Sequence, residues 1–260
     1  MDKFMQLTED LNEKYNSIEE FRKKADASVA KISFSDKAYA PIAALKFLRL
    51  LRDHTQAILL LAYQEFNCQE LFLLPSALAL CRTVLETFGR LIWLIKENDP
   101  DKREIRFISM LENEKHENNK YRNEDRSRFD HDNNIFETHI TQAQKNLSEG
   151  ASVRRERVPK AQALLTEIGE DSLSELYSLL NKSVHGNHQA TWIYTENDKA
   201  LDLIKEEGWY CPLFICHYTY IFAIDEFLNK FGDDNAVVTE EIKKEIKDCQ
   251  NRLSVCKSFI

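Results

Sequence analysis

The sequence predicts an all-α protein, built as a single helical bundle of about eight to nine helices. Only 6 glycines and 5 prolines occur in 260 residues, too few for the many tight turns of a β-sandwich or β-barrel. Most segments repeat apolar residues at helical spacing. No internal repeat and no Pro- or Ser-rich linker divides the chain, so one domain is expected over 1–260. Its parts are an N-terminal helix within 1–35, a core over 36–232 and a C-terminal helix within 233–260.

The first half of the chain alternates long helices with short connections. Residues 3–31 are amphipathic, 36–66 begin with capping residues and a proline near the first turn, and 70–97 are the most hydrophobic segment. A helix over about 100–127 begins at NDPDKR, with Pro100 near its first position. Its second half is almost entirely charged and buries little, so we expect it to project from the body or to be mobile.

The second half of the chain is read in the same way. Gly169 is expected to close one helix, because glycine readily adopts the left-handed conformation at a helix C-terminus. The helices expected here lie near 133–148, 155–168, 170–185, 197–207, 210–230 and 236–258.

Charge and cysteine usage limit the compartment and the partners. The formal net charge of −8 argues against a strongly basic nucleic-acid scaffold, although a local basic site remains compatible with it. The six cysteines form no C-x-x-C pair and several lie in apolar runs, which favours free thiols in the cytoplasm. The polar, acidic N-terminus does not resemble a signal peptide, and the apolar stretches are too short or too interrupted to span a bilayer.

Several classes of site are disfavoured by missing motifs. The sequence has no G-x-x-x-x-G-K-[ST], no E-x-x-H and no G-x-S-x-G, which disfavours a phosphate-binding loop, a di-metal bundle and a hydrolase elbow. Cys211 and the pair Cys216–His217 could suggest a metal site, but no second pair has the spacing of a zinc finger. We interpret them as core residues and expect no metal and no cofactor.

The helix predicted over 70–97 is apolar apart from one charged stripe. Arg82, Glu86 and Arg90 follow at intervals of four, which places them on one face of the helix. One interpretation is a buried or half-buried ion-pair ladder that fixes the register of the helix, since unpaired charges are costly to bury. The other is a polar pocket in which Arg82 binds an anion and Glu86 orients a group or accepts a proton. The stripe alone leaves both interpretations open.

A second polar stripe ends the helix predicted over 170–185. Ser178, Asn181 and His185 share a face, Ser183 lies beside them, and Gly186 follows. Histidine titrates near neutral pH, which suits general acid–base catalysis. A histidine in the last turn followed by glycine is equally typical of an ordinary helix C-terminus.

These two places together resemble a family of uncharacterised prokaryotic all-helical proteins. The resemblance consists of R-x-x-x-E in an apolar helix and a later Tyr…S-x-H-G helix end, with DP-x-x-R and E-K between them, and it covers about residues 36–230. The matching residues are Arg82, Glu86, Tyr177, Ser183, His185, Gly186, Asp99, Pro100, Arg103, Glu114 and Lys115.

That family looks like a distant branch of the HEPN superfamily. HEPN proteins are helical bundles, commonly dimeric, and many are metal-independent endoribonucleases of phage defence, toxin–antitoxin and CRISPR systems. The resemblance therefore implies a HEPN-like core, RNA as substrate, and a homodimer or a defence-system partner. The candidate catalytic residues are His185, Arg82 and Glu86, and the candidate substrate-binding residues are Ser183, Asn181, Arg90 and Tyr177.

The chain departs from the HEPN pattern at its defining motif. HEPN nucleases pair arginine and histidine on one helix as R-x4-6-H, but residues 178–180, ahead of His185, are Ser, Leu and Leu. Arg82 would have to supply the arginine from another helix. Two further R-x4-H strings, Arg49–His54 and Arg126–His131, are of a kind that arises easily in a charged chain.

The departure and the acidic net charge support an alternative function. On this hypothesis the protein is a non-catalytic helical interaction or nucleotide-sensing module in a defence complex, and the polar stripes bind a nucleotide or stabilise the bundle.

Overall fold

A computed structural model describes residues 39–67, 73–120, 126–149, 156–184, 208–231 and 240–256. Every regular element in these ranges is an α-helix, which confirms the predicted all-α class. The helices are α2 (Tyr39–Asn67), α3 (Leu74–Lys96), α4 (Pro100–Lys120), α5 (Arg126–Lys145), α6 (Ala161–Glu167), α7 (Asp171–Val184), α10 (Tyr210–Phe231) and α11 (Glu240–Cys256). The helices predicted at 3–31 and 197–207 fall outside the described residues.

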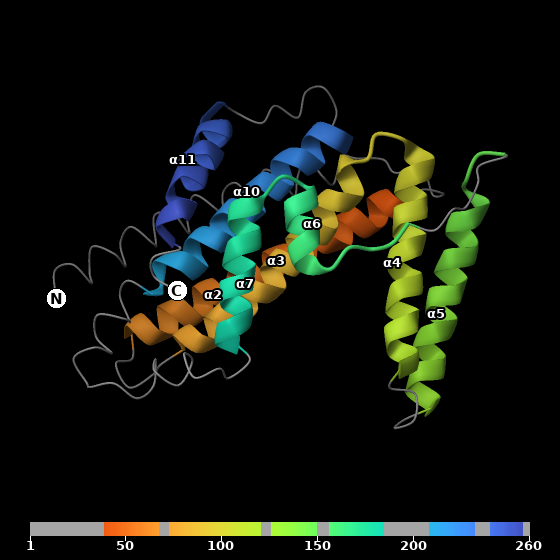
Figure 1. The fold of residues 1–260 in the computed structure, drawn as a ribbon, viewed down its shortest axis with the longest axis horizontal. Helices are drawn as coiled ribbons and strands as arrows, with labels where there is room; N and C mark the ends of the chain where they lie inside the picture. Colours follow the sequence, from red (N-terminus) through yellow and green to blue (C-terminus); the bar gives the residue numbers. More distant parts are fainter. Residues whose placement is uncertain are drawn as a thin grey trace.

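Helix α3 is the centre of the described bundle. It packs against α2, α10, α7 and α6, and α11 packs against α10 (Figure 1). Its sequence explains this position, because Phe88, Leu91 and Ile92 are completely buried while the charged residues Arg82, Glu86 and Arg90 share one stripe. Tyr218 and Phe227 of α10 are completely buried as well and extend the same apolar core. Among the described helices, none combines the length and the apolar character needed to cross a bilayer.

The pair α4–α5 stands at one end of the molecule, at the right of Figure 1. All buried residues of α4 lie between Glu104 and Leu111, and its charged second half runs away from the bundle beside α5, as the sequence predicted. Helix α5 begins at Arg126 rather than near 133, and polar side chains contribute to its contact with α4. The amide of Asn133, for example, donates to the side-chain oxygen of Asn119 at 2.9 Å.

Helix α6 shows how local chemistry sets a boundary. It begins at Ala161 rather than near 155, since Pro159 disfavours helical backbone at the residue before it and cannot donate a helical hydrogen bond. It ends as predicted at Gly169, whose φ of 87° lies in the left-handed region. The backbone N–H of Glu170 donates to Leu165 O at 2.8 Å and that of Gly169 to Thr166 O at 3.0 Å, the pattern of a Schellman motif.

The first turn of α2 is capped from a distant helix. The backbone N–H of Ala40 donates to Oε1 of Glu104, on α4, at 2.9 Å. The Glu104 residue is only 6% exposed, and its Oε2 is buried without a hydrogen-bond partner. Burial raises the pKa of this carboxyl, and the backbone donors of α2 oppose the shift. Glu104 therefore joins α4 to α2, although one of its carboxyl oxygens is buried without a hydrogen bond.

The raised pKa of Glu104 predicts a specific pH dependence. An acid with a raised native pKa binds its proton more tightly in the folded state, so its contribution to stability is complete below its unfolded pKa and is lost as pH rises through the folded one. Relative to Glu104→Gln, the wild type should therefore lose unfolding free energy as the pH rises from about 4, the ordinary range of a glutamate, through the raised pKa of Glu104. Urea denaturation across this range measures the difference. The exposed Glu149→Gln serves as control, and a difference between wild type and Glu104→Gln that does not change with pH would contradict the prediction.

Candidate functional site

Arg82 and Glu86 lie one turn apart on the face of α3 that meets α7. Nε of Arg82 is 3.2 Å from Oε1 of Glu86, and the two side chains are 29% and 31% exposed. The predicted charged stripe is therefore half-buried at this point, because Leu85 and Phe88 beside it are turned completely into the core. A half-buried pair is screened less than a surface pair and remains open to solvent on one side.

Tyr177 of α7 completes the group. Its hydroxyl donates to Oε1 of Glu86 at 2.7 Å and accepts a long hydrogen bond of 3.4 Å from Nε of Arg82. The guanidinium carbon also lies 5.9 Å from the centroid of the Tyr177 ring, within the range of a cation–π contact. We call Arg82, Glu86 and Tyr177 the α3–α7 cluster.

The electrostatics of the α3–α7 cluster keep Tyr177 and Arg82 protonated. Burial raises the pKa of Tyr177, and its hydrogen bond to Glu86 raises it further, so the phenol stays protonated and can donate. The hydrogen bond to Tyr177 raises the pKa of Arg82, and the neighbouring Glu86 acts in the same direction. Both polar contacts of Arg82 use Nε; within the described part of the chain, its Nη1 and Nη2 make no hydrogen bond or ion pair. Arg82 thus offers a fixed, charged fork to a ligand.

The other predicted site residues are Arg90, Asn181, Ser183 and His185, and the outcome differs among them. Arg90 pairs with Glu114 of α4, with Nη1 and Oε1 3.4 Å apart, and makes no recorded contact with the α3–α7 cluster. Asn181 lies one turn beyond Tyr177 on α7, half-buried, and its Oδ1 is buried without a partner. Ser183 belongs to α7, but its side chain is outside the described structure, and His185 lies beyond the described residues.

The described residues show no site at either of the two other R-x4-H strings. Arg49 and His54 lie on α2, where a separation of five residues turns them about 140° apart around the helix axis. Arg49 is exposed, whereas His54 is half-buried and its pKa is lowered, mainly by burial. His131 is exposed on α5, and the side chain of Arg126 is outside the described structure.

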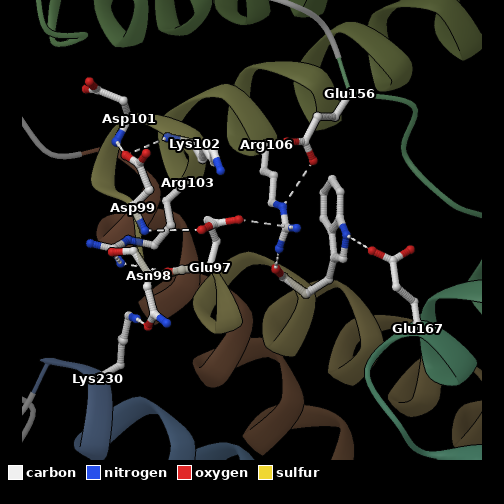
Figure 2. Close-up of polar contacts among 11 residues, drawn as sticks. Glu97, Asn98, Asp99, Asp101, Lys102, Arg103, Arg106, Glu156, Glu167 and Lys230 are labelled. Carbon is white, nitrogen blue, oxygen red and sulfur yellow. Dashed lines mark hydrogen bonds and ion pairs between the residues drawn. The ribbon is translucent and has the colours of Figure 1, made fainter. Parts of the chain in front are cut away.

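The DP-x-x-R string forms the turn between α3 and α4 (Figure 2). The Asp99 carboxylate accepts the backbone N–H of Asp101 at 2.9 Å and so caps α4. Nη1 of Arg103 donates to the carbonyls of Glu97 and Asn98, at 2.7 and 3.1 Å, which satisfies acceptors just after the end of α3. The string therefore has a structural role in this chain, as a lock on the α3–α4 turn.

Sequence reasoning did not single out Arg106, the residue that connects the elements beside the α3–α4 turn. Arg106 of α4 lies between the carboxylates of Glu97 and Glu156, at 3.6 and 3.1 Å, and stacks on Trp93 with its guanidinium carbon 4.7 Å from the ring centroid. Figure 2 shows these groups converging from α3, α4 and the segment before α6. The only sequence signal was an arginine close to the apolar face of α4, which spacing alone does not distinguish from a solvated charge.

A model of a protein family of unknown function, DUF5677, matches residues 41–201. The matched range runs from α2 through α7 and contains the whole α3–α7 cluster, whereas α10 and α11 lie outside it. No curated protein and no solved structure matches the chain.

Proposed function

We propose that this chain, which belongs to the DUF5677 family of unknown function, is a HEPN-like metal-independent endoribonuclease. The observation that carries the proposal is the arrangement of Arg82, whose Nε is held by Glu86 and Tyr177 while its Nη1 and Nη2 point to no protein partner in the described residues. A role in prokaryotic phage defence or in a toxin–antitoxin system rests on the sequence resemblance alone.

The chemistry assigned to Arg82 is phosphate binding. A guanidinium fork binds two phosphate oxygens at once, and it stabilises the extra negative charge that develops when a phosphodiester is attacked. Glu86 and Tyr177 orient the fork by holding Nε, and the 29% exposure of the Arg82 side chain leaves room for a ligand to approach. These two residues are positioning residues under this proposal.

The chemistry assigned to His185 is proton transfer. Cleavage of RNA without a metal needs a base that takes the proton of the 2′-hydroxyl and an acid that protonates the leaving 5′-oxygen. The 2′-oxygen then forms a bond to phosphorus as the bond to the 5′-oxygen breaks, which leaves a cyclic phosphate and a 5′-hydroxyl. His185 follows Val184, the last residue of α7, and lies eight residues after Tyr177 in the sequence. Asn181, between them, has a buried side-chain oxygen without a partner, which would have to turn toward solvent to accept a ribose hydroxyl.

The test is RNA cleavage by purified protein in excess chelator. Wild type should produce cyclic-phosphate ends, and both His185→Ala and Arg82→Ala should reduce the rate by about a hundredfold or more. Arg82→Lys should recover only part of the activity, because lysine lacks the planar fork. Absence of cleavage by the wild type, or equal cleavage by wild type and variants, would refute the proposal.

Arg52→Ala is the matched control. The Arg52 side chain is 26% exposed, close to the 29% of Arg82, and likewise pairs with a neighbouring acid, Asp53, but it lies on α2. Its replacement removes the same charge from a similar environment, so its cleavage rate should stay close to that of the wild type. A loss equal to that of Arg82→Ala would mean that net charge, rather than the α3–α7 cluster, governs RNA binding.

A non-catalytic interaction module is the second candidate, favoured by apolar residues exposed on α2. Leu60 is 59% exposed and Tyr63 is 52% exposed, three residues apart on one face of the helix. Such a face suits a second copy of the chain or a defence-system partner. Light scattering of the wild type beside Leu60→Glu separates the cases: a dimer that becomes a monomer on substitution supports an interface there, and a wild-type monomer excludes a homodimer.

A further inference from the structure

A cluster of three different donor types lies where α11 packs against α10, away from the α3–α7 cluster. It consists of a nitrogen of His217, a carboxylate oxygen of Glu245 and the sulfur of Cys249, and these atoms all lie within 4.8 Å of one another. We propose that these residues bind a zinc ion, or a divalent ion of similar chemistry, that fastens α11 to the bundle. Neither helix falls within the range matched by the DUF5677 model, so the proposal does not depend on the family.

The donors fit zinc by type, and small side-chain movements would bring them to the spacing of a tetrahedral site. Zinc is bound by histidine nitrogen, cysteine thiolate and carboxylate oxygen at about 2.0–2.3 Å, which places neighbouring ligand atoms of a tetrahedral site about 3.3–3.8 Å apart. Nε2 of His217 and Oε1 of Glu245 are 2.9 Å apart, so a bridging ion needs only a small outward movement of the pair. Glu245 and Cys249 are four residues apart on α11, and this spacing directs both side chains toward α10.

Burial distinguishes the cluster from a chance surface grouping. The His217 side chain is 9% exposed, and its Nδ1 is buried without a hydrogen-bond partner. Cys249 is 2% exposed. Two of the three donor residues are therefore buried, and the imidazole presents Nε2, rather than this Nδ1, to Glu245. The Glu245 side chain is 45% exposed, which gives an ion a route from solvent and leaves the fourth coordination position to water.

Cys211, Cys216 and His217 are all buried, as the sequence interpretation expected, but His217 also makes a polar contact. Cys211 and Cys216 are buried at 0% and 1% exposure and make no part of the cluster, as expected of core residues. His217 differs from them because its ring turns toward α11 and pairs with Glu245 at 2.9 Å. The sequence offered no finger-like spacing because the ligands come from two helices about thirty residues apart.

Cobalt spectroscopy of the full chain tests the proposal. Adding Co²⁺ to metal-free wild type should give one bound ion per chain with thiolate-to-cobalt charge transfer and a tetrahedral d–d spectrum, both displaced by Zn²⁺. Cys249→Ser should abolish the charge-transfer band, and Glu245→Gln should weaken binding at least about tenfold. Zinc should raise the melting temperature of the wild type and leave that of Cys249→Ser unchanged.

The controls separate this site from general effects. Cys216→Ser removes a buried thiol next to the cluster, and Asp248→Asn removes an exposed acid from the same helix. Both should retain the cobalt spectrum when circular dichroism shows that they are folded. No stoichiometric binding by wild type, or a charge-transfer band that persists in Cys249→Ser, overturns the proposal. Because Glu245 is exposed, Glu245→Gln should fold even where the cysteine variants fail. An affinity of Glu245→Gln for Co²⁺ equal to that of the wild type would also overturn the proposal. RNA cleavage is measured in excess chelator, so it does not depend on the proposed zinc ion, and the two proposals can fail independently.

Discussion

Replacing Glu65 with glutamine is expected to lower the free energy of unfolding by about 2–3 kcal/mol, although the substitution changes almost no volume. Glu65 lies near the end of α2 and is 4% exposed. Its Oε2 accepts the backbone N–H groups of Leu73 and Leu74, where α3 begins, and its Oε1 accepts the indole N–H of Trp209 at 3.0 Å. One carboxylate thus caps α3 and anchors the residue just before α10.

The physical reason is that the groups hydrogen-bonded to Glu65 among the described residues are all donors. A carboxylate only accepts hydrogen bonds, whereas an amide presents one oxygen and one NH₂. In Glu65→Gln, the NH₂ must face either Trp209 or the start of α3, which leaves buried donors opposed to each other. Glu65→Ala leaves three donors without a partner and should cost about 4–5 kcal/mol.

Urea denaturation followed by circular dichroism measures both Glu65 variants. Gln64→Ala, at the exposed neighbouring position on α2, should stay within about 0.5 kcal/mol of the wild type. A stability of Glu65→Gln equal to that of the wild type would show that the three contacts contribute nothing to the fold.

Glu65 also shows where sequence reasoning stops. Periodicity identified α2 and α3 because apolar spacing is a local property of each segment, and Gly169 marked the end of α6 because a left-handed residue is a local requirement. A lone glutamate at the end of an apolar helix has no such signature. Its role in the fold depends on a hydrogen bond from Trp209, which is 144 residues away in the sequence.

For the candidate site, the sequence predicted the contact within one helix but not the contacts between helices. The pairing of Arg82 with Glu86 follows from their spacing on one helix. Arg90 has the same spacing from Glu86, yet it pairs with Glu114, because the direction of a long side chain depends on which helix packs against that turn. The contact of Tyr177 with Glu86 depends on how α7 crosses α3, a fact of packing that spacing within either helix does not contain.

Replacing Arg106 with methionine is expected to destabilise the protein by about 3–4 kcal/mol. The Arg106 side chain is 16% exposed, and its Nη1 donates to the carbonyl of Trp93 at 2.6 Å. It also pairs with Glu97 and Glu156 and stacks on the Trp93 ring, whose indole N–H donates to Glu167 at 2.9 Å (Figure 2). Methionine preserves much of the stacked volume but leaves two carboxylates and a carbonyl facing one another without a cation.

The size of the destabilisation in Arg106→Met depends on the two carboxylates left without a cation, and this dependence can be tested directly. Arg106→Lys keeps the charge but loses the fork and the flat stacking surface, so it should cost about half as much as methionine. Adding Glu156→Gln to Arg106→Met should restore about 1 kcal/mol or more, because one of the two opposed charges is removed. Lys102→Met, which removes an exposed charge from the same helix, should have almost no effect. If the double variant is no more stable than Arg106→Met, the cost lies in lost stacking on Trp93, and the joint between α3, α4 and α6 is held by packing rather than by charge.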